Sequence, residues 1–243
     1  MKTTHIFLLL VFTPFISFGQ INQSIDIIGG LDYSYRNLTS SSDESLTSQL
    51  IESLSEDESG ILSWRFGANY NKKITNKLFL KTGLRLASVG YKGLNNTDLR
   101  WGSQHDGMGG FDPSLPSNEP SEVQFTYNFW FIDIPIAVRY EVNQKKFSPF
   151  FELGVSPSIY ITTRTRQETN LDTSTSSFDE TRTSFNRLNL VGFASVGFNY
   201  NLCEKLQIFA QPIFRYHLTS SREGDYGEHL FTAGLELGVR KNL

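Results

Sequence analysis

Large apolar and polar side chains alternate with a period of two in several stretches of this chain, up to its last residues. In the final stretch one parity carries Phe231, Leu235 and Val239, whereas the other carries Gly234 and Glu236. Such alternation is typical of β-strands that have one face in an apolar medium. A spanning helix needs about 18 uninterrupted apolar residues, whereas a tilted spanning strand needs only about 9–11, half of them polar. The alternation therefore favours a β-barrel in a membrane.

The N-terminal segment has the pattern of a secretory signal. Lys2 precedes a short apolar run that ends at the small residues Ser17 and Gly19. This order of features is typical of a cleaved export signal, whereas the alternative, a retained membrane anchor, needs a longer apolar run. We therefore expect a signal peptide over 1–19 and a single barrel domain over 20–243.

Eight segments of the remaining chain carry the alternation. We expect strands over 24–37, 60–72, 77–92, 124–140, 147–163, 186–200, 206–219 and 229–243. Short polar turns alternate with long polar loops between them, and the long loops cover 38–59, 93–123, 164–185 and 220–228. Outer-membrane barrels have short turns in the periplasm, long loops outside the cell and an even number of strands. The sequence therefore predicts an all-β fold, an eight-stranded antiparallel up-and-down transmembrane barrel in the outer membrane.

Aromatic residues make up 14% of the chain and gather near the ends of these segments. Those near the short turns are Tyr70, Phe79, Tyr140, Phe147, Phe150, Tyr200 and Phe209, and those near the long loops are Tyr33, Tyr35, Trp64, Tyr91, Tyr127, Trp130 and Tyr160. Aromatic side chains favour membrane interfaces, so this distribution predicts two girdles on the lipid face. The alternative is a soluble sandwich with scattered aromatic residues.

Charged residues within the strands lie opposite the large apolar residues of the same strand. A midplane Arg or Lys on the lipid face would cost roughly 2–4 kcal/mol, so these charges must point inward. The interior of an eight-stranded barrel is only wide enough for side chains. We therefore expect a structural charge network that fills the lumen, made of Arg65, Arg85, Asp133, Arg139, Glu152, Arg215, Glu236 and Arg240, with Asp26 and Asp32 on the same face. A soluble lipocalin-like barrel would need the reverse arrangement.

Glycines and prolines within the strands predict local adjustments. Six glycines share the inward parity and would make room for long Arg and Glu side chains: Gly67, Gly83, Gly154, Gly197, Gly234 and Gly238. Pro135, Pro157 and Pro212 lack the N–H that a β-ladder uses. We expect a bulge at each of these prolines.

Two neighbouring segments resemble a known family. Residues 131–140, with the sequence FIDIPIAVRY, and residues 149–154, with the sequence PFFELG, resemble the central hairpin of the PorT-like outer-membrane β-barrel family. The resemblance implies an outer-membrane barrel and transfers no catalytic residue. It also implies an accessory role in secretion or envelope assembly. The chain departs from many such barrels because it ends in Leu243 where they end in an aromatic residue.

The long loops are the expected place of any specific activity. In the first loop a capping-box pattern at 41–44 precedes leucines at every fourth position, which predicts a short amphipathic helix that covers the barrel mouth. In the third loop, residues 163–166 and 180–183 flank a tip rich in Ser and Thr. These flanks predict that the fifth and sixth strands continue beyond the membrane as a hairpin and are the tallest.

Three histidines, His105, His217 and His229, follow the expected signal, and Ser220 and Ser221 lie near two of them. A serine hydrolase needs a nucleophile beside a positioned His and carboxylate, but no nucleophile motif surrounds these serines. The histidines also lack the paired spacing of metal ligands. We therefore expect no enzymatic activity, no metal and no cofactor.

The formal net charge of −3 offers no basic footprint for nucleic acid. The expected partners are outer-membrane lipid, the barrel-assembly machinery during biogenesis and an envelope protein that contacts the extracellular loops. The predicted function is a non-enzymatic structural or interaction role at the cell envelope. The alternatives are a narrow porin-like channel or small-ligand binder, and a lipid-modifying outer-membrane hydrolase.

Overall fold

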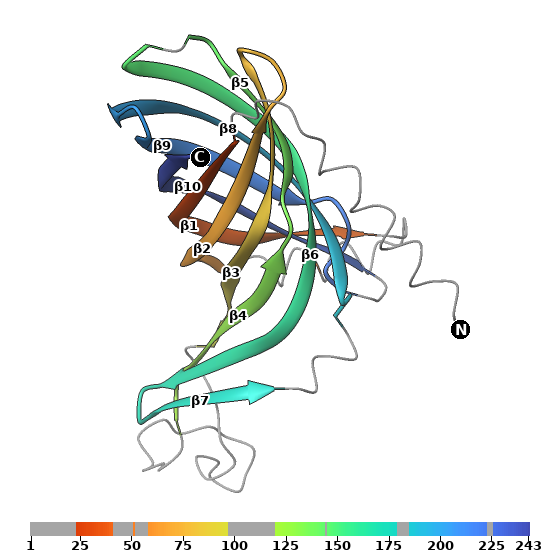
Figure 1. Cartoon of the computed structure of the whole chain (residues 1–243). Coiled ribbons are helices and arrows are strands. Elements are labelled where there is room, and N and C mark those ends of the chain that lie inside the picture. The colour runs from red at the N-terminus through yellow and green to blue at the C-terminus, as the bar shows by residue number, and fades with distance from the viewer. Residues whose placement is uncertain are drawn as a thin grey trace, which may run out of the picture.

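The computed structural model is a closed ring of antiparallel β-strands (Figure 1). It describes residues 23–40, 51, 58–96, 120–143, 145–178, 185–222 and 226–243. The strands are β1 (Gln23–Ser40), β2 (Ser59–Lys73), β3 (Leu78–Asn96), β4 (Val123–Asp133), β5 (Ile136–Glu141), β6 (Phe147–Thr169), β7 (Thr173–Phe178), β8 (Leu188–Cys203), β9 (Leu206–His217) and β10 (Tyr226–Asn242). In this part of the chain no helix is long and apolar enough to cross a membrane. The expected signal peptide lies outside the described residues, as does the expected helix of the first loop apart from residue 51, which is helical.

The ring closes because the first and last strands pair with each other. β1 pairs with β10, with Ile27 opposite Val239, and with β2 on its other side. β4 and β5 occupy one position in the ring, because both lie between β3 and β6. The order around the ring is β1, β2, β3, β4 with β5, β6, β8, β9 and β10. This order confirms the predicted eight-stranded antiparallel up-and-down barrel.

The barrel has a turn end and a loop end. Short turns join β2 to β3, β5 to β6 and β8 to β9 at the turn end. The first and last described residues also meet there, where the Leu243 N–H donates to the Gln23 carbonyl oxygen at 2.9 Å. At the loop end β4, β6 and β7 extend beyond the other strands (Figure 1). An outer-membrane orientation places the turn end in the periplasm and the loop end outside the cell.

The tall hairpin at the loop end differs in part from its prediction. β6 is the longest strand, with 23 residues, and β7 returns beside it with Glu168 opposite Thr173 and Arg164 opposite Ser177. The expected extension of the fifth strand is therefore right. The strand expected over 186–200, the sixth of the prediction, is β8. It has only 16 residues and is separate from β7, so the prediction that it is equally tall is wrong. Residues 180–183 lie outside the described residues.

The prolines within the strands cause gaps instead of bulges. Pro135 lies in a break between β4 and β5. The predicted bulges at Pro157 and Pro212 are wrong, because the β6–β8 and β9–β10 ladders continue through these prolines without a change of register. The N–H that Pro212 lacks would point to the other side of β9. There the β8–β9 ladder has no pair between Ser195–Ile213 and Phe198–Ala210.

Apolar side chains cover the outside of the ring, and charged side chains lie inside it. On the outer wall Leu62 is 74% exposed and Leu153 is 69% exposed. In the lumen Arg85 is 1% exposed and Arg139 is fully buried. This arrangement is the one that a barrel needs when lipid contacts its outer wall.

Several aromatic residues predicted for the lipid-facing girdles instead point into the lumen. Tyr91, Tyr160, Phe150 and Phe209 are buried, so their assignment to the girdles is wrong. The residues that do face outward include Tyr33, Trp64, Tyr140, Phe147 and Tyr200. Near the loop end the inward rings belong to a cluster of Ala87, Val89, Tyr91, Phe129, Phe131, Tyr160, Phe185 and Leu230, and near the turn end to a cluster of Ile28, Phe150 and Phe209.

Inward glycines provide the space that these rings and the lumen charges need. A Cβ atom on Gly197 would overlap the ring of Phe150. A Cβ atom on Gly67 would lie 2.8 Å from Cγ of Arg85. The glycines therefore make room for an Arg, as predicted, but also for aromatic rings, because a barrel of this size fills its interior with side chains.

Candidate functional site in the barrel lumen

The centre of the lumen holds a carboxylate that contacts two cations. Nζ of Lys81 on β3 lies 2.8 Å from Oε1 and 2.7 Å from Oε2 of Glu152 on β6. Nε of Arg139 on β5 lies 3.3 Å from the same Oε2. Lys81 is absent from the predicted set, although it shares the inward parity of Gly83 and Arg85, and this parity is the signal that identifies it.

A second carboxylate centre lies beside the first. Oε2 of Glu236 on β10 lies 3.3 Å from Nη1 of Arg85 and 3.1 Å from Nη2 of Arg215. The side-chain amide of Gln211 donates to Oε1 of Glu236 at 2.6 Å and accepts from Nη2 of Arg139 at 3.2 Å. Gln211 therefore links the two carboxylate centres. Sequence reasoning missed Gln211 because a neutral amide gives no charge signal.

The network continues to the opposite wall. Nη1 of Arg215 lies 3.9 Å from Oδ2 of Asp133, and the Ser158 hydroxyl donates to Oδ1 of Asp133 at 2.6 Å. Nearby, Nη1 of Arg65 lies 2.8 Å from Oδ2 of Asp32. A contiguous series of contacts thus runs from Lys81 to Asp133 through side chains of β3, β6, β5, β9, β10 and β4. We call this series the lumen network.

Aromatic rings contact the arginine guanidinium groups that the carboxylates satisfy only in part. Buried guanidinium nitrogens of Arg85, Arg139 and Arg215 have no hydrogen-bond acceptor among the described residues. Cζ of Arg139 lies 3.6 Å from the ring centroid of Phe150. Cζ of Arg85 and Cζ of Arg215 lie 5.9 Å and 5.5 Å from the ring centroid of Phe193. A desolvated cation over an aromatic face gains about 2 kcal/mol, so the inward rings stabilise the charges beside them.

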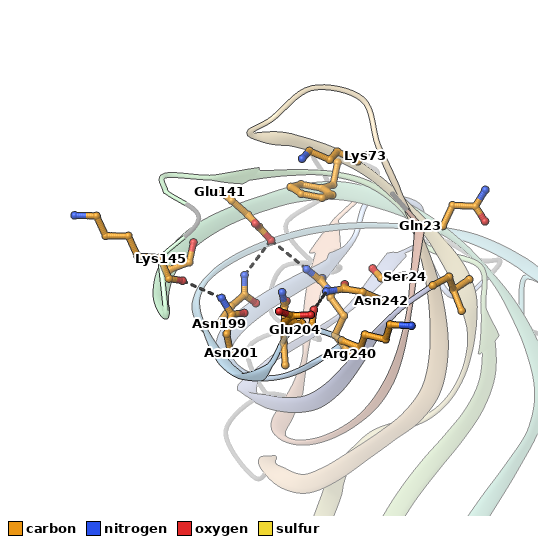
Figure 2. A pocket seen from close by; sticks show the side chains of 15 residues that line it. Gln23, Ser24, Lys73, Glu141, Lys145, Asn199, Asn201, Glu204, Arg240 and Asn242 are labelled. Atoms are coloured by element: carbon orange, nitrogen blue, oxygen red, sulfur yellow. Dashed lines mark hydrogen bonds and ion pairs between the residues drawn. The ribbon is translucent and has the colours of Figure 1, made fainter. Parts of the chain in front are cut away.

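At the turn end, Arg240 closes the lumen beneath an open pocket (Figure 2). Its Nε lies 2.8 Å from Oδ1 of Asp26, and its Nη1 lies 3.1 Å from Oε1 of Glu141. The Asn199 amide donates to the same Glu141 oxygen at 2.9 Å. The pocket has a volume of about 460 Å³, and its rim carries Lys73, Lys145, Glu204 and Lys205. Its inner wall is therefore made of paired charges.

At the loop end, a further Arg joins three polar groups. Nη1 of Arg36 lies 2.8 Å from Oε2 of Glu228 and donates to the Tyr91 hydroxyl at 2.8 Å. Arg36 also pairs with Glu58, which lies just before β2. The sequence prediction omits Arg36, although it has the same parity as the inward Asp26 in β1.

The histidines and serines near the loop end come together only in part. The Ser221 hydroxyl lies 3.2 Å from Nδ1 of His217, and both residues are buried. The carboxylate of Glu228 binds Arg36 instead of this pair. The cavity beside His217 has a volume of only about 10 Å³, which is room for about one water molecule. His105 lies outside the described residues.

Metal-ligating side chains do not gather in the part of the chain that the structure describes. No group of three or more His, Cys, Asp or Glu residues there has the arrangement of a metal site. The single cysteine, Cys203, is free and exposed beside the turn between β8 and β9. The polar chemistry of the described lumen is therefore that of ion pairs, hydrogen bonds and cation–π contacts.

Comparisons with known proteins agree with this geometry. A family model described as the outer membrane protein beta-barrel domain matches residues 33–223. No match is found among curated protein sequences.

Solved structures similar to the chain include three outer-membrane proteins. Neisserial surface protein A is 12% identical over 93% of this chain and 100% of its own, with a TM-score of 0.45. Ail of Yersinia pestis, in complex with the heparin analogue sucrose octasulfate, is 12% identical over 90% of this chain and 99% of its own, with a TM-score of 0.39. The outer membrane protease OmpT of Escherichia coli is 9% identical over 94% and 99%, with a TM-score of 0.43. Identities this low carry no information about function.

Proposed function

The chain belongs to the outer membrane protein beta-barrel domain family, and from this premise we propose that it is a closed, non-conducting barrel with a non-enzymatic structural or interaction role at the cell envelope. The lumen network carries this proposal. Its contacts run from Lys81 on β3 across the lumen to Glu236 on β10 and back to Asp133 on β4, through side chains that are at most 5% exposed. An ion that crosses this lumen would have to displace paired charges from one another, which is strongly unfavourable in a buried setting.

Further layers on both sides of the network support closure. On the periplasmic side, Arg240 with its two carboxylates and the cluster of Ile28, Phe150 and Phe209 lie across the path. On the extracellular side lies the larger apolar cluster that contains Phe129. Each layer consists of side chains in contact, and all members of the apolar cluster except Phe185 lie on strands, so closure depends little on the loops.

The hairpin that β6 and β7 form at the extracellular end is the proposed contact for a partner protein. β7 pairs with β6 on one side, and within the described ranges no strand pairs with its other edge. A free strand edge presents backbone groups to which an extended segment of another protein can add. An envelope partner would therefore meet this hairpin first, because it extends beyond the rest of the barrel (Figure 1).

An accessory role in secretion or envelope assembly is the more specific form of this proposal. It is supported by the resemblance of residues 131–140 and 149–154 to the PorT-like family. In the barrel these segments are neighbours, with Arg139 opposite Glu152 in the β5–β6 ladder. The resemblance therefore concerns residues that build the wall and the lumen network.

Two other candidate functions have specific observations attached. A small-ligand binder is favoured by the periplasmic pocket of about 460 Å³ in front of Arg240. A hydrolase would require Ser221 and His217 to receive a substrate, but both side chains are buried, and the cavity beside them has only about 10 Å³. The second observation supports a non-enzymatic role.

Single-channel recording in planar lipid bilayers tests the closed barrel. The refolded mature protein is expected to give no steady current, whereas a porin reconstituted in the same way shows that pores are detected. A heat-induced shift in gel mobility confirms that the inserted protein is folded. A steady, ion-selective current from the pure folded protein would overturn the proposal in favour of the channel.

A further inference from the structure

Two tryptophans and an arginine form a connected group on the outer wall of β2, β3, β4 and β6. Trp64 and Trp130 are the cross-strand partners of Ser88 on its two sides, and their rings meet edge to face with centroids 5.3 Å apart at 86°. Cζ of Arg164 lies 4.9 Å from the Trp130 ring. These side chains face outward, because the adjacent Arg65 and Thr163 on the opposite parity are buried in the lumen.

The register places two cations on the same outer face as the tryptophans, closer to the extracellular end. Arg164 pairs with Asn128, which lies two residues from Trp130 toward the extracellular end of β4. Lys92, on the same face of β3, lies opposite Thr126, a further step in the same direction. Toward the periplasm from the tryptophans the outer wall is apolar, with large exposed side chains such as Phe66 and Leu84. Along the wall toward the extracellular end, the order is therefore large apolar side chains, then the tryptophans, then the cations.

Among the described residues, two of these cations have no carboxylate partner. Arg166, next on the outer face, pairs with Glu168 at 2.7 Å. Arg164 has no carboxylate partner within the described ranges, and Nζ of Lys92 donates only to the neutral amide of Gln124 at 3.5 Å. A bare cation beside the interfacial aromatic residues lies at the depth of lipid headgroups, where phosphates are the available anions.

We propose that Arg164, Lys92 and the Trp64–Trp130 pair form a binding site for the phosphorylated headgroup of a lipid in the outer leaflet. The guanidinium of Arg164 has the planar donor geometry that binds phosphate oxygens in pairs, and Lys92 adds a point charge. The cation–π contact with Trp130 holds the Arg164 side chain against the wall, so little side-chain entropy is lost on binding. The tryptophan rings then contact the upper acyl region of the same lipid.

The periplasmic end offers a matched comparison. Nζ of Lys77 lies 6.0 Å from the Tyr140 ring, and Nζ of Lys146 lies 5.4 Å from the Tyr200 ring. These are also cations beside outward aromatic residues, but they lie at the turns and contact the opposite leaflet. Removing both charges there reproduces the loss of two cations without touching the proposed site.

Native mass spectrometry of the folded protein in detergent tests the proposal, with lipid A, the same lipid A stripped of its phosphates and inorganic phosphate as probes. We expect the protein to retain phosphorylated lipid A, and the double variant Arg164→Gln with Lys92→Gln to retain it about tenfold less well, because two charge-assisted contacts are lost. The double variant Lys77→Gln with Lys146→Gln is expected to retain it as well as the unchanged protein. The heat-induced gel shift checks that every variant is folded.

Three outcomes would overturn the proposal. Equal retention of phosphorylated and stripped lipid A would mean that only the apolar wall binds. Equal losses in the two double variants would mean that any cation at a girdle suffices. Displacement of the lipid by millimolar inorganic phosphate would mean that the site holds a free anion and not a lipid headgroup.

Discussion

Lys81 and Glu152 form an ion pair in the barrel interior, with Nζ and Oε2 2.7 Å apart and neither side chain exposed. The two residues lie 71 positions apart in the chain and on strands that are not neighbours in the ring. Their contact therefore bridges the inner face of β5, the one strand that lies between β3 and β6 at this level. Because Arg139 uses the same carboxylate, Glu152 is the anion that two buried cations share, and its loss would leave both without a carboxylate partner.

Replacement of this carboxylate should destabilise the barrel strongly. Glu152→Ala leaves Lys81 and Arg139 buried without their anion, and removal of one partner of a buried ion pair costs about 3–5 kcal/mol. We expect a clear fall in the temperature of the heat-induced gel shift. Glu204→Ala, which removes an exposed carboxylate at a turn, should leave that temperature unchanged. An unchanged shift temperature for Glu152→Ala would argue against the pairing.

Substitution on the lipid face should discriminate by charge and not by size. Leu84 is 60% exposed on the outer wall near the middle of β3. Leu84→Arg is expected to lower the free energy of unfolding in lipid vesicles by roughly 2–4 kcal/mol, whereas Leu84→Phe should be mild. Urea titration followed by tryptophan fluorescence measures both. Equal tolerance of the two variants would contradict the assignment of faces.

Two glycines should differ in their tolerance of the same added methyl group. A Cβ on Gly67 would lie 2.5 Å from the Leu84 carbonyl oxygen and 2.8 Å from Cα of Arg85, whereas a Cβ on Gly29 would have no atom within 4 Å. Gly67→Ala should therefore cost about 1–3 kcal/mol through overpacking, and Gly29→Ala should be close to neutral. Unfolding of the two variants in the same urea series gives the comparison. Equal stabilities would show that the inward glycines do not set the width of the lumen.

Shortening the extracellular hairpin should leave the barrel intact. Arg166 and Thr175 are cross-strand partners, so an Asn-Gly turn can replace residues 167–174 between them without a change of register. We expect the free energy of unfolding to stay within about 0.5 kcal/mol, because the change removes only the three outermost β4–β6 pairs and leaves the rest of the ring paired. Cross-linking at the cell surface before and after the change then measures the contribution of the hairpin to partner contact. A large loss of stability would mean that the hairpin is part of the folded core.

Much of the lumen could be predicted from parity, but not its full membership. Arg139 and Glu152 have charges opposite an apolar face, and the alternation places them inside. Lys81 has the same parity and a charge, so the same pattern marks it, whereas Gln211 has no charge to mark it. Phe129 and Phe131 share the parity of Asp133 but have the large apolar Ile132 on the other face, so the pattern in β4 does not distinguish inside from outside. In β4 the volume of the lumen decides which face points inward.

The amino-acid sequence by itself determined the class of the molecule: eight strands, two faces, short turns at one end and long loops at the other. It could do so because alternation and loop length are local properties that each strand carries independently. Only the tertiary structure decided which charges meet, that Glu152 is shared by Lys81 and Arg139, and that aromatic rings share the interior with them. Those contacts depend on the register between strands and on the limited space inside a closed ring, and neither is a property of any one segment.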